Sequence, residues 1–150
     1  MRNVIAFRHA HPVVRQSRFL HAHIRPRDGL KDVTWVAPSG QEKETHHWVD
    51  PERRCLGVVL RGAAEALAAE ALDETVMLIV NAAGEPTGFV MPVGGESGRW
   101  RLELDTSRAD GTRDDPPLFA PGETVPVPAH SILVFVEALG GGGPEEGAAP

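Results

Sequence analysis

From Lys31 onward, glycine and proline residues divide the sequence into short apolar segments. Breakers such as Pro38-Ser39-Gly40 and Asp50-Pro51 mark turns, and short apolar runs between turns are typical of β-strands. Several such strands in succession predict a mostly β fold, an antiparallel β-sandwich. The predicted strands cover residues 33–36, 56–60, 75–81, 87–91, 99–105 and 131–136.

Two of these segments predict how the strands are covered. Residues 75–81 (TVMLIVN) are apolar on both faces, which indicates a central strand packed on both sides. Residues 99–105 alternate, so Trp100, Leu102 and Leu104 should share one buried face while the charged residues between them face water. The sheet should therefore combine a doubly covered strand with a strand that has one solvated face.

Several stretches do not follow the strand pattern. Residues 63–73 (AAEALAAEALD) have strong helix propensity and are either a short helix or a surface insertion. The proline-bounded residues 125–128 should lead into the last strand, and the glycine-rich residues 94–98 should form a turn. Residues 140–150 (GGGGPEEGAAP) lack the apolar side chains that a fold needs and should be a disordered tail.

The first 28 residues have a different pattern, which predicts a short N-terminal helical segment. Residues 3–10 have helically spaced apolar positions, Asn3 is a suitable N-cap, and Pro12 should end the helix at His11. A second short helical segment is expected over residues 13–20. The few apolar side chains of this region cannot form a core alone, so the region must dock on another surface. They are Val4, Ile5, Phe7, Val13, Phe19 and Leu20.

Charge is distributed unevenly along the chain. Residues 1–31 contain seven Lys/Arg and one acidic residue, a formal charge of +6. The remaining residues contain eight Lys/Arg and twenty Asp/Glu, a formal charge of −12. A basic arm can bind nucleic acid, but this one has no aromatic residues interleaved in the pattern of a nucleic-acid module. We favour the interpretation that this basic arm is a helix that packs on an acidic partner surface, or that its charges form a solvated face. We expect no nucleic-acid partner.

The length and composition exclude several classes of protein. At 150 residues, the chain is too short for a complete (β/α)8 barrel, which needs about 250 residues. No apolar run approaches the roughly 20 residues that span a bilayer, and the N-terminus has no signal-peptide pattern. The single cysteine cannot form an internal disulfide, which suits a reducing compartment. We therefore expect a cytoplasmic protein with no membrane partner.

Residue types capable of catalysis or metal binding are present without a recognisable arrangement. The histidines include three close pairs, but no third ligand follows at a metal-site spacing. Cys55 lies beside Arg53 and Arg54, which would favour a thiolate, yet it opens an apolar strand, where cysteine is usually buried. The sequence therefore predicts no catalytic residue, no metal site and no cofactor. The histidine pairs are His9/His11, His21/His23 and His46/His47.

The three tryptophans are the remaining candidates for ligand contact, because a flat aromatic ring can stack on the C–H face of a sugar. Trp100 shares its predicted face with two leucines and should be a core residue. For Trp35 and Trp48, three interpretations are open: they lie in the core, they cover a neighbouring domain, or they contact a sugar directly. They are the substrate-binding candidates of this chain.

Short motifs follow one another along the chain up to about residue 139. They are AFRHAHPVVR (6–15), RFL (18–20), LKDVTW (30–35), PSG (38–40), Trp48, RCLGV (54–58), MLIVNA (77–82), RW (99–100), DT (105–106) and VPAHS (127–131). In this order they resemble the C-terminal end of bacterial glycogen debranching enzymes of the isoamylase type. Those enzymes belong to the α-amylase superfamily, glycoside hydrolase family 13.

The resemblance implies a division of the chain into three parts. Residues 1–28 would be the terminal helix of a missing catalytic barrel and its exit segment, residues 29–139 the C-terminal β-sandwich domain, and residues 140–150 the disordered tail. Without its barrel partner, the helix should dock loosely or pack onto the sandwich. Apolar surface left exposed in this way favours self-association.

The resemblance also implies an activity that lies elsewhere. Enzymes of this family hydrolyse the α-1,6-glucosidic branch points of glycogen with carboxylates on barrel strands, and no matching motif occurs in this sequence. We therefore expect a fragment that lacks the barrel and is inactive alone. Its partners would be α-glucan, through the parent enzyme, and a separate catalytic barrel or a second copy of the chain. The alternative is a stand-alone carbohydrate-binding β-sandwich module.

Overall fold

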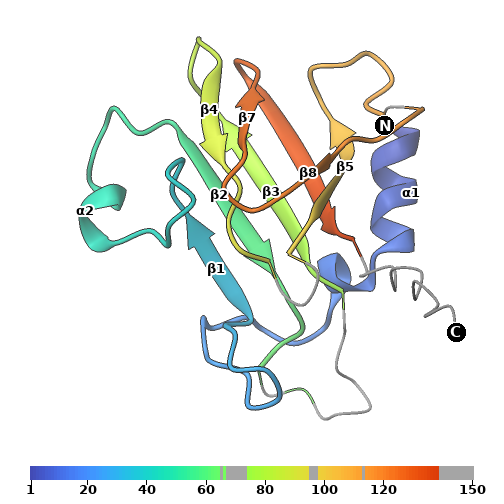
Figure 1. Cartoon of the computed structure of the whole chain (residues 1–150). Helices are drawn as coiled ribbons and strands as arrows, with labels where there is room; N and C mark the ends of the chain where they lie inside the picture. The colour runs from blue at the N-terminus through green and yellow to red at the C-terminus, as the bar shows by residue number, and fades with distance from the viewer. Residues whose placement is uncertain (65, 67–73, 95–97, 113, 139–150) are drawn as a thin grey trace, which may run out of the picture.

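A six-stranded antiparallel sheet is the centre of the fold (Figure 1). The computed structural model describes residues 1–64, 66, 74–94, 98–112 and 114–138. The strand order is β1-β2-β3-β8-β5-β6, which places β3 and β8 in the middle. The strands are β1 (Val33–Val36), β2 (Cys55–Leu60), β3 (Val76–Asn81), β5 (Trp100–Asp105), β6 (Leu118–Phe119) and β8 (Ser131–Glu137).

A second, two-stranded sheet covers one face of the large sheet, which we call the inner face. It consists of β4 (Thr87–Val90) and β7 (Thr124–Val127) paired antiparallel. The expectation that residues 125–128 only lead into the last strand was wrong, because most of them form β7. Proline has no backbone N–H to donate to a neighbouring strand. Pro126 is tolerated because, among the described strands, β7 pairs only with β4, so no strand-to-strand hydrogen bond is lost along its other edge.

The core between the two sheets is apolar and almost fully buried. Phe89 and Val127 from the small sheet meet Met77, Ile79 and Phe135 from the large one, and all five are 0% exposed. The other members of this inner core are Val36, Cys55, Val59, Met91, Trp100, Leu102, Val125 and Leu133. The expected antiparallel β-sandwich is thus confirmed.

The N-terminal segment packs on the opposite, outer face. A 3-10 turn, η1 (Pro12–Arg15), inserts Val13, which is 2% exposed, into a second cluster on this face. Helix α1 (Arg2–Ala10) has no fully buried residue and contributes Phe7 to the margin of the same cluster. Because β3 has buried or half-buried side chains on both faces, it is the doubly covered strand that the sequence predicts. The outer cluster is Val13, Val76, Leu104, Val134 and Val136.

Two details of the N-terminal helices differ from expectation. Helix α1 ends at Ala10, ahead of Pro12 as predicted, but it begins at Arg2. Asn3 therefore lies inside the helix and is not its N-cap; its side-chain amide donates to the carbonyl of Asp110 at 2.6 Å. The second helical segment stops at Arg15 and does not continue to residue 20.

A register shift in β5 also overturns a predicted face. Leu102 lies opposite Phe135 of β8, whereas Leu104 lies opposite Val134, so one residue of β5 is bulged out between them. The bulge turns Leu104 to the outer face, away from Trp100 and Leu102. The alternating sequence alone could not indicate this extra residue.

Some expectations fall on parts of the chain outside the described residues. These include most of 63–73, residues 95–97 of the predicted turn, and the tail at 140–150. Within the described part, no helix has the length and apolar character required to cross a membrane.

Candidate functional site

Trp35 lies in β1, which is an edge strand of the large sheet. The next residue, Val36, points into the inner core and is 2% exposed. Because side chains alternate along a strand, Trp35 points to the other face, opposite Val58 of β2. There it is 40% exposed, an unusually open position for an indole.

The loop after β1 brings a second tryptophan to the same place. The backbone N–H of Ala37 donates to Gln41 at 2.8 Å, which closes a turn, and that of Lys43 donates to the carbonyl of Trp35 at 2.8 Å. The loop therefore runs back along β1 before it enters α2 (Thr45–Trp48). In Figure 1, α2 stands beyond the β1 edge of the sheet.

A reciprocal cap holds α2, which has only four residues. The Glu44 side chain accepts from the backbone N–H of His47, and the backbone N–H of Glu44 donates to Nδ1 of His47 at 2.9 Å. This second bond requires Nδ1 to be unprotonated. Desolvation and the positive charges of His46 and Arg53 lower the pKa of His47, which favours the same neutral form.

The result is a pair of exposed indoles in contact. The rings of Trp35 and Trp48 meet edge to face, with centroids 5.4 Å apart and an interplanar angle of 79°. The ammonium of Lys43 lies 4.0 Å from the centroid of Trp48, within cation–π range. We call these three residues the tryptophan corner.

The three tryptophans therefore fall into two groups, one buried and one exposed, and the prediction that Trp100 is a core residue is confirmed. Trp100 is 0% exposed, and its indole N–H donates to the carbonyl of Pro92 at 3.0 Å. Trp35 and Trp48 come together on the surface, and Trp48 is 51% exposed. The tryptophan corner offers a sugar two apolar ring surfaces and a cationic donor for its hydroxyl groups.

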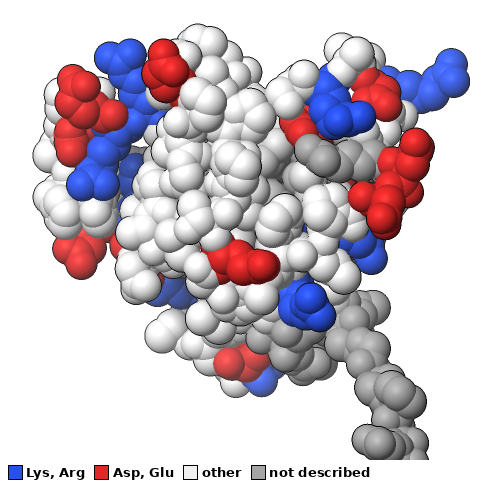
Figure 2. Space-filling view, turned by 45° about the horizontal axis from the view of Figure 1, so that its top comes forward, with Lys and Arg blue, Asp and Glu red and all other residues white. Residues whose placement is uncertain are grey.

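Charged side chains surround this region, whereas the middle of the molecule has few. Figure 2 shows Lys/Arg and Asp/Glu side chains gathered on the side of the α2 loop and again on the opposite side of the molecule. In the α2 loop, Arg53 pairs with Asp50 at 2.9 Å, an exposed ion pair that also holds the Asp50-Pro51 turn. The tryptophan corner thus lies beside a mixed-charge loop and not in a uniformly charged field.

The other candidate groups lie apart from this corner. Cys55 is in the inner core, and burial raises the pKa of its thiol to about 11, so the thiolate that Arg53 and Arg54 would favour does not form at neutral pH. The side chain of His11 pairs with Glu74. The rings of His21 and His23 lie 5.5 Å apart. No three His, Cys, Asp or Glu side chains of the described ranges converge as metal ligands would.

Sequence reasoning missed Lys43 of the tryptophan corner and the capping residue His47 of the neighbouring helix α2. Lys43 lies in a polar stretch with no periodicity that would place its ammonium over Trp48. His47 was weighed only as one of a histidine pair. The signal that could have indicated α2 was Glu44 followed three residues later by a side chain able to return the capping bond.

Comparisons with known proteins place the chain in a family. The family described as isoamylase, C-terminal, matches residues 32–131. Proteins named glycogen operon protein GlgX homolog, from Mycobacterium bovis and from two strains of Mycobacterium tuberculosis, are each 34% identical over 143 residues. The alignment covers 92% of this chain and 20% of each relative, so the chain spans one fifth of their length. Since the family match extends over more than half of the sequence, the chain belongs to the isoamylase C-terminal family.

Proposed function

We propose that the chain is the C-terminal β domain of a glycogen debranching enzyme and that it supports a catalytic barrel without hydrolysing glucan itself. The family match over residues 32–131 carries this proposal. The mycobacterial relatives, named as glycogen operon proteins, are about five times as long as the matched region, which leaves room for a barrel. Hydrolysis of α-1,6-glucosidic branch points is then assigned to carboxylates of that barrel.

An incompletely covered part of the outer face supports a docking role. Leu56, Val80 and Ile132 lie side by side across β2, β3 and β8 and belong to neither core cluster. Leu56 and Val80 are half-buried, and Ile132 is 37% exposed. We call these three residues the outer row. An apolar row on a central sheet is stabilised when a neighbouring domain removes it from water.

Helix α1 supports the same role. It has nine residues, none of them fully buried, and Val4 and Ile5 are 50% and 51% exposed. A helix this short is marginal in water unless packing stabilises it. We propose that residues 1–28 are the last barrel helix and its exit, that residues 29–139 form the β domain, and that the exposed apolar side chains of α1 face the barrel in the parent enzyme.

A reducing-end assay on amylopectin tests the assignment of catalysis. The purified 150-residue chain should release no new reducing ends, while an isoamylase added to a parallel sample releases them. Debranching that co-purifies with the chain through two different columns, and is absent from a mock preparation, would contradict the proposal.

A second candidate function is glucan binding by the tryptophan corner. The observation that favours it is the contact between two exposed indoles, Trp35 and Trp48, with Lys43 over one of them. This candidate applies both to an isolated module and to a complete enzyme. Glucan is in both cases the partner that we propose.

Native electrophoresis in glycogen-containing gels tests this candidate. The chain should be retarded, and Trp48→Ala should reduce the retardation strongly without changing the thermal midpoint by more than the exposed control Phe19→Ala. Phe19 is 83% exposed and belongs to a different segment. Equal retardation of Trp48→Ala and Phe19→Ala, or no retardation of the unaltered chain, would remove the glucan-binding candidate.

We also propose a cytoplasmic location. Its support is the free thiol of Cys55, which is typical of a reducing compartment, and the proposed role in glycogen breakdown. The location can be checked by fractionating the source cells.

A further inference from the structure

The tryptophan corner is built from two elements that are held to very different degrees. Trp35 belongs to β1, and the pairing of this strand with β2 fixes it in the large sheet. Lys43 and Trp48 belong to the loop that carries α2, a helix of only four residues. A helix this short is not stable by itself in water and depends on its cap and its packing. The geometry of the corner therefore depends on what holds α2.

A hydrogen bond between Glu44 and His47 closes this loop between Lys43 and Trp48. Glu44 directly follows Lys43, and His47 directly precedes Trp48. The backbone N–H of Glu44 donates to Nδ1 of His47 at 2.9 Å, and the backbone N–H of His47 donates to the carbonyl of Glu44, also at 2.9 Å. These bonds keep the two ends of the segment close, with the ammonium of Lys43 4.0 Å from the centroid of the Trp48 ring. His47 is thus a positioning residue for the corner.

Protonation of His47 removes one of these bonds. A neutral imidazole has one N–H and one acceptor nitrogen, whereas both nitrogens of an imidazolium are donors. A protonated Nδ1 cannot accept from Glu44, because two N–H groups would then meet across the 2.9 Å between the nitrogens. The imidazole must turn away, and the backbone N–H of Glu44 loses its partner. The capping bonds that remain involve the Glu44 side chain and the backbone of α2.

The charged groups around His47 oppose its protonation more than they favour it. The ring of His46 lies against that of His47, with centroids 4.0 Å apart. Desolvation lowers the pKa of His47, and the positive charges of His46, Arg53 and Lys43 act in the same direction. Glu44 is the acid that acts against them. The neutral, bond-accepting form is therefore the one that this loop is built to hold.

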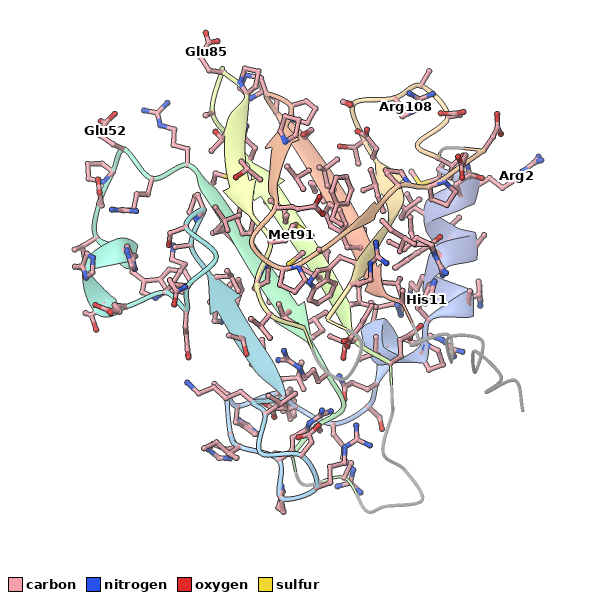
Figure 3. All side chains as sticks on the ribbon, viewed as in Figure 1. Arg2, His11, Glu52, Glu85, Met91 and Arg108 are labelled. Atoms are coloured by element: carbon pink, nitrogen blue, oxygen red, sulfur yellow. The ribbon has the colours of Figure 1, made fainter. Side chains whose placement is uncertain are left out.

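His46 responds to acid in the opposite way. Its Nδ1 lies 3.4 Å from the carboxylate of Glu44, an exposed pair that is ionic only when His46 is protonated. Protonation of His46 therefore adds an interaction within α2. Glu52 lies on the same loop, and its carboxylate points away from α2 (Figure 3). The two adjacent histidines thus provide a test residue and a matched control.

We propose that protonation of His47 switches off glucan binding by the tryptophan corner, so that the corner holds an α-glucan at neutral pH and releases it in acid. This inference rests on the second candidate function, because it states how binding at that same surface is regulated. In the neutral form, the capped helix presents the rings of Trp35 and Trp48 together with Lys43. In the protonated form, α2 opens, Trp48 moves away from Trp35, and the two-ring surface is lost.

Co-sedimentation of the full chain with glycogen, from about pH 7.5 to about pH 5, tests this inference. The neutral form of His47 is the binding form, and its pKa lies below the ordinary value of 6.5. Binding should therefore be complete above pH 6.5 and fall as the pH drops through the lowered pKa. Loss of one capping bond from so short a helix should reduce the affinity by at least about threefold.

Two substitutions of His47 separate its hydrogen bond from its other properties. His47→Gln keeps an acceptor at the capping position without a titrating group, so its glycogen binding should not depend on pH. His47→Lys offers only donors, so it should bind at least about threefold more weakly than His47→Gln at neutral pH. His46→Gln is the control and should follow the pH profile of the unaltered chain. Near-UV circular dichroism checks that each variant keeps the fold.

The outcomes distinguish the switch from the binding itself. If the unaltered chain does not sediment with glycogen at neutral pH, where the cap is intact, the glucan-binding candidate fails and the inference fails with it. The inference alone is overturned if the unaltered chain binds equally well at both ends of the pH range. It is also overturned if His47→Gln loses binding in acid in parallel with the unaltered chain, or if His47→Gln and His47→Lys bind equally at neutral pH.

Discussion

Val13 should hold the N-terminal segment on the sheet, and replacing it with alanine measures this contact. Val13 is 2% exposed and packs among Val76, Leu104, Val134 and Val136. The substitution removes two buried methyl groups, each worth about 0.8 kcal/mol, and leaves a small cavity. The free energy of unfolding should fall by about 2 kcal/mol, which lowers the thermal midpoint by roughly 4–8 °C for a chain of this size.

Urea unfolding of the full chain, followed by circular dichroism, measures the change. Val4→Ala is the matched control, because the same atoms are removed from a side chain that is 50% exposed. Its effect should remain within about 0.5 kcal/mol. If Val13→Ala unfolds at the same urea concentration as the unaltered chain, or if Val4→Ala costs as much, Val13 does not anchor the segment.

Three further predictions follow from other parts of the structure. In Gly57→Ala, the new Cβ would lie 2.8 Å from Cζ of the fully buried Phe89, so urea unfolding should show a loss of about 1–3 kcal/mol; an unchanged midpoint would show that the ring yields freely. The pKa of His47 is lowered in the folded chain, so its cap on Glu44 stabilises the fold above pH about 6.5, and this stabilisation is lost as the pH falls through the lowered pKa. Tryptophan fluorescence should change over that pH range, and His47→Gln should abolish the change. The Cys55 thiol, with a pKa raised to about 11, should react with a thiol reagent at neutral pH only after unfolding, and rapid reaction of the native chain would contradict its burial.

Much of the sandwich could be predicted because the apolar pattern dictates it. Residues 33–36 match β1, and the expected segments at 56–60 and 75–81 differ from β2 and β3 by one residue each. Buried strands of this kind are specified by their own side chains and by the turns around them.

The missed elements depend on contacts between distant residues. β7 contains Pro126, which local propensity excludes from a strand but which an edge strand tolerates. The bulge in β5 depends on how β8 pairs with it, so the orientation of Leu104 was predicted wrongly. Helix α2 has too few residues to be favoured by propensity and depends on the cap between Glu44 and His47.

The candidate site was predictable only in part for the same reason. Trp35 and Trp48 were expected as candidates from residue type, with a core position left open for both. Strand alternation explains the exposure of Trp35 only once Val36 is placed in the core, and the exposure of Trp48 depends on helix α2. The approach of Lys43 to Trp48 and the burial of Arg61 depend on the folded loop and on the sheet. An arginine at the end of a strand gives no indication in the sequence that it will be 95% buried.

Native-state hydrogen exchange of the 150-residue chain tests most directly whether α1 belongs to a partner while the strands form the stable unit. Amides of β3 (Val76–Asn81), covered on both faces, should exchange only through global unfolding. Amides of α1 (Arg2–Ala10), a helix with no fully buried residue, should exchange at least about a hundredfold faster through local opening. Protection of α1 equal to that of β3 would contradict the account, because the helix would then already have its full set of partners within this chain.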